Sequence, residues 1–358
     1  MRSSTHVLRK DFLLGHRMAG AALWLLLFTG LLGACNDGQR TPRTVEPAFY
    51  YWKSAYQLSA YEQRCLDSLR VKTLYVKFFD VDWDELTHQP IPKAVVQFAK
   101  APVATIIPTV FITNQTLQQV SPAQAAELPG KITQLVKGIL EKHQLPAPTE
   151  VQIDCDWSES TQAKYFALRK KIKAGFPTAQ LSATIRLYQT KYHQKAGVPP
   201  VDKGLLMCYN MGNLKTLGTG NSIIETAELE KYIGNLNSYP LPLDVALPIF
   251  NWKVWFREGL YKGITEELPD SLLHGPVFAQ NKHRYTAQYD TLLQGYELRK
   301  GDVLRWETSD YPVVLAAAKS IANKLKNTQC RVSLYHLDSL LLSKFSIHEL
   351  EDLFNGLR

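Results

Sequence analysis

The chain has 358 residues, of which 45% are hydrophobic, 11% aromatic and 21% charged, and this composition excludes a wholly disordered chain or a fibrous repeat. The formal net charge is +8. Residues 1–34 contribute four basic residues and one acidic residue, a net +3, which leaves +5 for the other 324 residues. Because this mild excess includes no Lys/Arg cluster, we expect no nucleic-acid partner.

Residues 1–34 have the organisation of a signal peptide. A basic stretch precedes an apolar run over 19–32, and these 14 residues are fewer than the roughly 20 that a membrane-spanning helix needs. The run ends in Leu32-Gly33-Ala34-Cys35, which resembles the bacterial lipoprotein lipobox. The resemblance implies cleavage before Cys35 and lipidation of Cys35, with residues 35–46 as the lipidated Cys and a polar tether. The alternative is an ordinary signal peptide followed by a Cys by chance.

A lipidated Cys35 implies a location in the bacterial cell envelope, where the lipid anchors the protein to a membrane without spanning it. Asn36 gives no obvious signal for retention at the inner membrane. We therefore expect a membrane partner through the lipid anchor, with the outer membrane favoured.

Eight short β-like runs alternate with helix-like stretches over residues 47–358. The expected strands are 49–53, 73–81, 109–113, 151–156, 181–187, 204–209, 243–250 and 331–337. The expected helices are 59–69, 122–143, 160–174, 225–235, 311–326 and 347–356. This alternation predicts parallel strands and an α/β fold, a (β/α)8 TIM barrel. The connection at about 256–310 is too long for a simple loop and predicts a rim insertion. The alternative is an open doubly wound sheet, which usually needs fewer strands.

In a TIM barrel the functional residues lie at the C-terminal ends of the strands. The fourth expected strand ends with Asp154 and Asp156, which share one face because side chains alternate along a strand. Two such carboxylates are costly in an apolar core unless each has a partner. Each raises the pKa of the other, so Asp154 or Asp156 is a candidate general acid. Glu159 and Glu307 are reserve candidates for that acid.

The run Asp154-Cys155-Asp156-Trp157 resembles the Asp-x-Asp-x-Asp-x-Glu pattern on strand four of family 18 glycoside hydrolases, the chitinase-like barrels, and of related glycosidase-like lipoproteins. Val201-Asp202 followed by Met207-Cys208-Tyr209-Asn210 resembles strand six of that family. The resemblance implies that Tyr209 and Asn210 position a glycan. Ser158 stands where the family has its catalytic Glu, and Glu159, one residue later, is expected to point to the opposite face. Family 18 chemistry relies on that acid, so a barrel that binds sugar without cleaving it stays an alternative.

Further candidates for glycan binding follow other expected strand ends. Tyr188, Trp252 and Trp255 have rings that can stack on the C–H face of a sugar, although a Trp is more often part of a core. His336 and Asp338 share a face of the eighth strand, so Asp338 can orient the imidazole. The competing interpretation of that pair is a structural hydrogen bond that closes the barrel against strand one.

We expect no metal and no cofactor, because the nine histidines lack ligand spacing and no phosphate-binding or zinc motif is present. The cysteines after the tether are expected to be buried free thiols: Cys65, Cys155, Cys208 and Cys330. The sequence therefore predicts a glycoside hydrolase-like envelope lipoprotein that acts on or binds a glycan in the barrel mouth. A non-catalytic carbohydrate-binding lipoprotein and an envelope scaffold are the alternatives.

Overall fold

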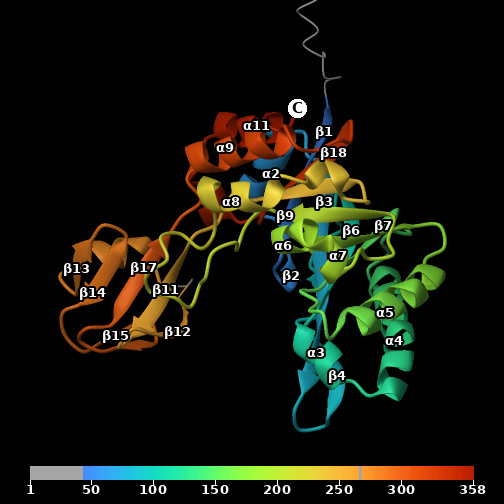
Figure 1. Ribbon diagram of the computed structural model, residues 1–358, viewed down its shortest axis with the longest axis horizontal. Coiled ribbons are helices and arrows are strands. Elements are labelled where there is room, and N and C mark those ends of the chain that lie inside the picture. Colours follow the sequence, from blue (N-terminus) through green and yellow to red (C-terminus); the bar gives the residue numbers. More distant parts are fainter. Residues whose placement is uncertain (1–42, 266–267) are drawn as a thin grey trace, which may run out of the picture. The chain divides into compact units, whose positions relative to one another are not determined.

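Eight parallel strands form a closed barrel (Figure 1) in the computed structural model, which describes residues 43–265 and 268–358. Each barrel strand pairs with the next along the chain, and β1 pairs with both β3 and β18, which closes the sheet. The barrel strands are β1 (Thr44–Tyr51), β3 (Thr73–Asp84), β6 (Thr105–Ile112), β7 (Glu150–Asp154), β8 (Gln180–Arg186), β9 (Lys203–Met207), β10 (Leu243–Pro248) and β18 (Gln329–Tyr335). The predicted (β/α)8 barrel is confirmed, and the open sheet is excluded. The signal peptide and Cys35 lie outside the described residues.

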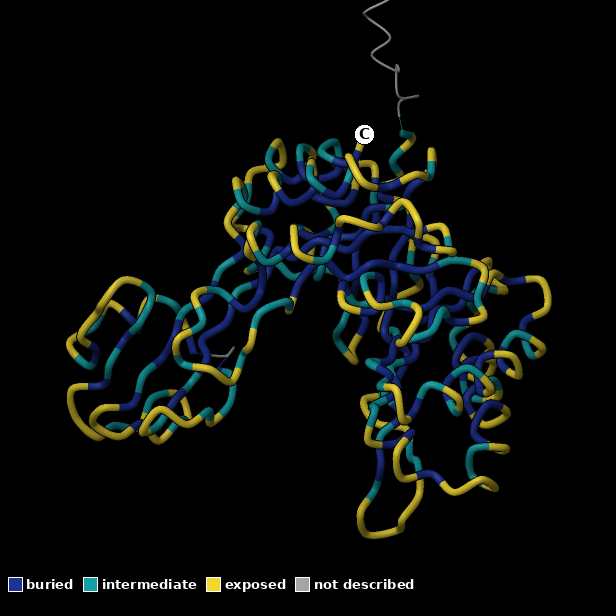
Figure 2. Tube along the Cα trace, in the orientation of Figure 1, coloured by how far each residue is buried: buried dark blue, intermediate teal, exposed yellow. Residues whose placement is uncertain are grey.

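The barrel strands are buried on both faces, which explains why they form apolar runs in the sequence rather than strict alternations. The strand β3 shows both patterns along its length. Its first seven residues are all buried, and its last five alternate between partly exposed and buried, because there it leaves the barrel and pairs with β4 (Gln89–Lys93) in an antiparallel hairpin. Figure 2 shows the barrel strands in dark blue and the hairpin tip in yellow.

A buried ion network joins four barrel strands at their N-terminal ends. Glu150 on β7 pairs with Lys203 on β9 at 2.9 Å and with Arg331 on β18 at 2.8 Å. Lys203 also pairs with Asp244 on β10 at 2.7 Å. Breaking a buried ion pair leaves one charge without a partner, so this network stabilises the end of the barrel at which the strands begin. The C-terminal ends of the strands are left for the site.

Helices cover the outside of the barrel, and each expected helix is present. They are α2 (Ala60–Ser68), α4 (Pro122–Lys142), α5 (Gln162–Gly175), α8 (Thr226–Ile233), α9 (Tyr311–Ala322) and α11 (Ile347–Asn355). The shorter elements are β2 (Ala55–Tyr56), β5 (Gln97–Phe98), α3 (Asn114–Gln119), α6 (Leu187–Lys191), α7 (His193–Ala196), η1 (Leu236–Ser238) and α10 (Ser339–Leu342). Within the described ranges, every helix is too short or too polar to cross a bilayer.

The chain between β10 and α9 forms a second sheet, antiparallel throughout, with the order β12-β11-β17-β14-β13. Its elements are β11 (Trp252–Arg257), β12 (Leu260–Ile264), η2 (Asp270–His274), β13 (Phe278–Asn281), β14 (Arg284–Ala287) and β17 (Val303–Glu307), with a hairpin of β15 (Thr291–Leu293) and β16 (Tyr296–Leu298). The insertion has its own apolar cluster, which includes Phe278, Tyr285 and Leu304. In contrast, Val254 and Phe256 of β11 belong to the barrel core, so the first strand of the insertion is packed against the barrel.

Candidate functional site

A cavity of about 920 Å³ opens at the C-terminal ends of the barrel strands. Its wall includes Asp154 and Asp156 at the end of β7, and Arg186 at the end of β8. The other predicted site residues on the wall are Tyr209, Asn210, Trp252, His336 and Asp338. Residues far apart in the sequence therefore meet in one cavity.

Asp154 is the last residue of β7 and is 6% exposed. Its burial, and next the nearby charge of Asp156, raise its pKa from 3.8 to about 6. The Thr184 hydroxyl donates a hydrogen bond of 2.6 Å to Asp154 Oδ1, which opposes part of that rise. A carboxyl group with this pKa can both donate and accept a proton near neutral pH.

Asp156 forms a two-pronged ion pair with Arg186. Arg186 Nε donates to Asp156 Oδ1 at 2.5 Å, and Arg186 Nη2 donates to Asp156 Oδ2 at 2.6 Å. Although burial lowers the pKa of Arg186, the hydrogen bonds and charge of Asp156 outweigh it, and the pKa is raised overall. Arg186 was not predicted as a site residue; its place at a strand end was the available signal. The pair fixes Asp156 as an oriented acceptor rather than a free acid.

Ser158, at the position of the family 18 acid, has its side chain in a polar group outside the cavity. Its hydroxyl lies 3.0 Å from Ser160 Oγ and 3.2 Å from Thr161 Oγ1. Glu159 is exposed and forms an ion pair of 3.1 Å with Lys195. The prediction that Glu159 is a catalytic residue is therefore corrected. Glu159 lies on the turn that leads out of the barrel to α5, and its side chain is solvated.

Glu307, the other reserve acid, is buried at the junction between the barrel and the insertion. It accepts hydrogen bonds from Arg305 Nε at 2.6 Å, from the Trp252 indole at 2.7 Å and from the Ser222 hydroxyl at 2.5 Å. These three donors occupy the carboxylate, and Glu307 does not line the cavity. It holds the Trp252 ring in place and cannot serve as the acid.

Aromatic rings form a large part of the cavity wall. The Tyr209 ring lies 5.3 Å from that of Tyr335 and 5.8 Å from that of Phe250, and the Phe250 ring lies 5.2 Å from that of Trp252. Trp52 adds a ring 5.7 Å from Tyr335. The Tyr209 hydroxyl is buried and has no hydrogen-bond partner within the described chain. The wall offers aromatic surface to a ligand, whereas the Tyr209 hydroxyl is closed to solvent.

Two predicted aromatic residues lie away from this cavity. The Trp255 indole donates to Asp302 at 3.0 Å and its ring contacts Tyr296, both inside the insertion. The Tyr188 hydroxyl donates to the Trp157 carbonyl at 3.1 Å, and its ring is on the surface. The prediction that these two residues line the cavity is therefore corrected. Trp255 faces the insertion's own cluster from β11, and Tyr188 belongs to α6 outside the barrel.

Asp338 has a structural role, which corrects the idea that it orients His336. Its carboxylate pairs with Lys53 at 2.6 Å and accepts from the backbone N–H of Leu340 at 2.8 Å, so that it caps α10. Burial lowers the pKa of His336, and its Nδ1 is buried without a hydrogen-bond partner in the part of the chain that is described. His336 therefore presents a neutral ring to the cavity.

A group of polar residues from the insertion and from the turn after α10 completes the wall, and sequence analysis did not find this group. Lys253 pairs with Asp270 and donates to the Leu268 carbonyl at 2.6 Å. Lys344 pairs with Asp270 at 2.7 Å and donates to Asn251 Oδ1 at 2.7 Å. These residues come from separate segments of the chain, so no local sequence motif predicts that they lie together.

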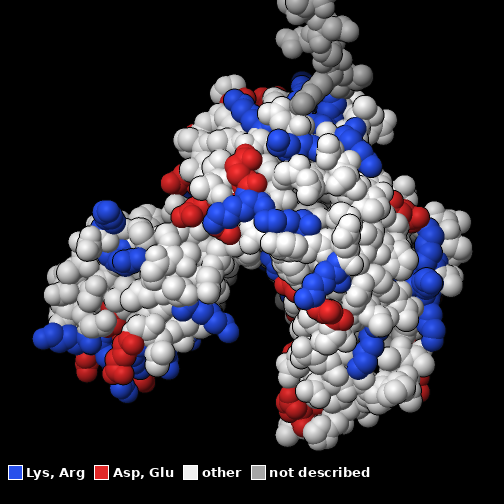
Figure 3. Space-filling model, in the orientation of Figure 1, with Lys and Arg blue, Asp and Glu red and all other residues white. Residues whose placement is uncertain are grey.

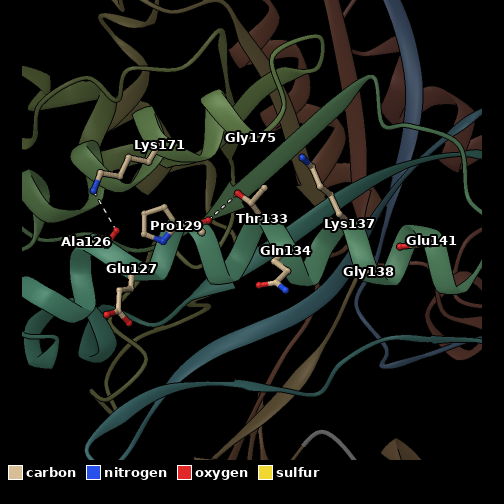
Figure 4. Close-up of a pocket in the computed structure, with 11 residues that line it drawn as sticks. Ala126, Glu127, Pro129, Thr133, Gln134, Lys137, Gly138, Glu141, Lys171 and Gly175 are labelled. Atoms are coloured by element: carbon tan, nitrogen blue, oxygen red, sulfur yellow. Dashed lines mark hydrogen bonds between the residues drawn. The ribbon is translucent and has the colours of Figure 1, made fainter.

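Other features of the described chain hold fewer converging groups. A groove of about 800 Å³ runs along α4 and α5, where Thr133 donates to the Pro129 carbonyl and Lys171 to the Ala126 carbonyl (Figure 4). No group of three potential metal ligands occurs within the described ranges. The four cysteines after the tether are buried and free, which confirms that prediction. On the face in Figure 3, Lys and Arg are interspersed with Asp and Glu.

Comparison with known proteins gives a likeness in structure. No family model and no curated protein matches the chain. The spore cortex-lytic enzyme SleL of Bacillus cereus matches with a TM-score of 0.52 and 14% identity, over 88% of this chain and 75% of that enzyme. The likeness shows a shared barrel fold. SleL of Bacillus megaterium (TM-score 0.49, 10% identity, 88% of this chain, 75% of that one) and a chitinase of Chromobacterium violaceum (0.48, 11%, 88% and 98%) also match.

Proposed function

We propose that the protein binds a glycan in the mouth of a glycoside hydrolase-like barrel. The observation that carries this proposal is the convergence of aromatic rings and oriented carboxylates on one cavity of about 920 Å³. Rings such as Trp52 and Tyr335, which are partly exposed on the cavity wall, can stack on sugar C–H faces. The Asp156 carboxylate, held by Arg186, is an acceptor for sugar hydroxyls.

Binding without family 18 hydrolysis is the function that the geometry supports best. The family 18 resemblance of the strand β7 stops at Ser158, whose hydroxyl is held outside the cavity. Glu159 and Glu307 do not replace the missing acid, because one is solvated and the other is buried among three donors. A substrate-assisted mechanism lacks its proton donor in such a site.

Hydrolysis with Asp154 as the acid is the second candidate. The observation that favours it is the pKa of about 6, raised by burial and by Asp156, which brings the titration of this carboxyl close to neutral pH, although most of it is ionised at pH 7. The burial of Asp154 argues against this candidate, because the residue is 6% exposed and accepts a hydrogen bond from Thr184.

A glycan panel decides between these candidates. Binding and release of reducing ends are measured for the purified protein, the Asp154→Asn variant and the Glu159→Gln variant, the last being a matched control because Glu159 is exposed. Binding without release supports the first proposal. Release that Asp154→Asn abolishes and Glu159→Gln retains supports the second. If no polysaccharide binds, both are wrong and the envelope scaffold becomes the better hypothesis.

We infer separately that the chain is a lipoprotein of the bacterial envelope, on the strength of the lipobox-like run before Cys35. Mass spectrometry and membrane fractionation of a Cys35→Ala variant test this inference. We expect loss of lipid mass and release from the membrane fraction. Unchanged processing and unchanged partition would contradict it.

A further inference from the structure

Four residues on the cavity wall form a group that we call the rim cluster: Asn251, Lys253, Asp270 and Lys344. Two lysine ammonium groups share the single carboxylate of Asp270. Asn251 adds an amide, which donates to Asp270 and accepts from Lys344. With both lysines protonated, the rim cluster carries one excess positive charge.

Each ammonium group in the rim cluster has a donor to spare. An ammonium group carries three N–H donors. Lys253 uses two of them, on Asp270 and on the Leu268 carbonyl, and Lys344 uses two, on Asp270 and on Asn251. Lys253 is only 2% exposed, so water cannot freely satisfy its third donor. A buried cation that lacks a full set of acceptors is costly to keep, and a bound anion would relieve that cost.

The acidic residues elsewhere on the wall do not cancel this excess charge. Asp156 is paired with Arg186, and Asp338 is paired with Lys53 at 2.6 Å. Asp154 is buried among the barrel strands. Asp156 and Asp338 therefore have their charges compensated by their own partners, and none of these three carboxylates forms an ion pair with Lys253 or Lys344. The rim cluster retains one cation without a carboxylate of its own.

Resting on the proposed glycan-binding function, we propose that the rim cluster is a subsite for a sugar unit that bears one negative charge. A carboxylate, or a sulfate ester, placed between Lys253 and Lys344 would accept one hydrogen bond from each ammonium group. The aromatic wall that includes Trp252 lies beside it on the same cavity and would take the sugar ring. The ligand is thus an acidic glycan rather than a neutral one.

The test compares glycans that differ only in charge. Polygalacturonate, alginate and hyaluronan oligosaccharides are each measured by calorimetry beside the same oligosaccharide with its carboxylates reduced to alcohols. A chondroitin sulfate oligosaccharide and its desulfated form serve as the sulfate arm. We expect at least one charged form to bind about tenfold more tightly than its neutral counterpart, with an affinity that falls as salt rises.

Lys344→Gln is the informative variant, because Lys344 is partly exposed and its loss does not empty the core. It should remove about tenfold of the preference for the charged form, measured as the ratio of the affinities for the charged and the neutral form. Lys131→Gln is the matched control, since Lys131 also pairs with a carboxylate but lies on the surface of α4; it should change neither affinity. Lys253→Met adds a second variant, with its melting curve as a check of folding.

The outcomes separate the two proposals. Equal affinity for charged and neutral forms, or binding of neutral glycans alone, overturns the rim cluster as an anionic subsite and leaves glycan binding in place. A charge preference that Lys344→Gln and Lys131→Gln both retain also overturns it. Failure of every glycan to bind overturns the proposed function and this inference together.

Discussion

Replacing Asp154 by Asn should change the stability of the protein in a pH-dependent way. The folded-state pKa of Asp154 is about 6 and its ordinary value is 3.8, so the folded state binds the proton more tightly than the unfolded chain does. Stability from this group is therefore lost as the pH rises through that window. The difference between the two pKa values corresponds to a loss of about 3 kcal/mol in the free energy of unfolding. This loss is absent below about pH 4 and complete above about pH 6.

Asn keeps an oxygen that can accept from Thr184 but carries no charge, so Asp154→Asn removes this penalty. We expect the two proteins to have similar free energies of unfolding at pH 4 and the variant to be more stable by about 3 kcal/mol at pH 7.5. Urea unfolding followed by circular dichroism at several pH values measures the difference. Asp156→Asn is the control: it leaves the Arg186 guanidinium without its partner and, because the Asp156 side chain is 45% exposed, should destabilise by no more than about 1 kcal/mol at pH 7.5. A difference between Asp154→Asn and the parent that is constant from pH 4 to pH 7.5 would refute the reasoning.

Three further predictions follow from the described contacts. Glu307→Gln should lower the free energy of unfolding by about 3–5 kcal/mol, because it leaves the buried Arg305 guanidinium uncompensated; chemical denaturation measures this. Tyr209→Phe should leave unfolding within about 1 kcal/mol of the parent, because the hydroxyl has no partner; it should also leave glycan affinity unchanged by calorimetry, because the hydroxyl is closed to solvent. The four buried thiols should react with a maleimide only after unfolding, as followed by mass spectrometry.

Each of these predictions has a result that contradicts it. A Glu307→Gln variant as stable as the parent would mean that the junction of barrel and insertion does not depend on the ion pair. Weaker glycan binding by Tyr209→Phe would mean that the ligand reaches a hydroxyl that is closed to solvent in the structure. Labelling of any of these thiols under native conditions would show that the segment around it opens in the folded protein.

The barrel could be predicted because its strands are buried on both faces and are separated by helices. A strand such as β10, buried throughout, is a short apolar run that stands out between polar stretches. The insertion was predicted only as an insertion on the rim, without its strands, because they follow one another with short connections and no helix separates them. Tertiary packing, rather than local pattern, decides how such strands pair.

In the candidate site, too, residues that follow a local sequence pattern could be predicted, and residues brought together by tertiary packing could not. Asp154 and Asp156 could be found because they are two residues apart on one strand, and period two predicts a shared face. Lys253, Asp270 and Lys344 could not, because their pairing spans up to 74 residues between Asp270 and Lys344. For Asp338 a signal existed: an Asp directly before a short helix is a common N-cap, and that role now explains the residue.

The strand β11 begins at Trp252 on the cavity wall and continues into the insertion, where it pairs with β17 in a register that sets Trp252 opposite Glu307. A slip of one residue in the pairing of β11 with β17 would turn the indole away from the cavity. The shape of the cavity therefore depends on this pairing and much less on the hairpin of β15 and β16, which we call the far hairpin. The turn at Gln294 and Gly295 of that hairpin is exposed, and both residues have positive φ, as tight hairpin turns require. The far hairpin is thus a graft point, where a fluorophore or a peptide could be installed while the binding surface keeps its shape.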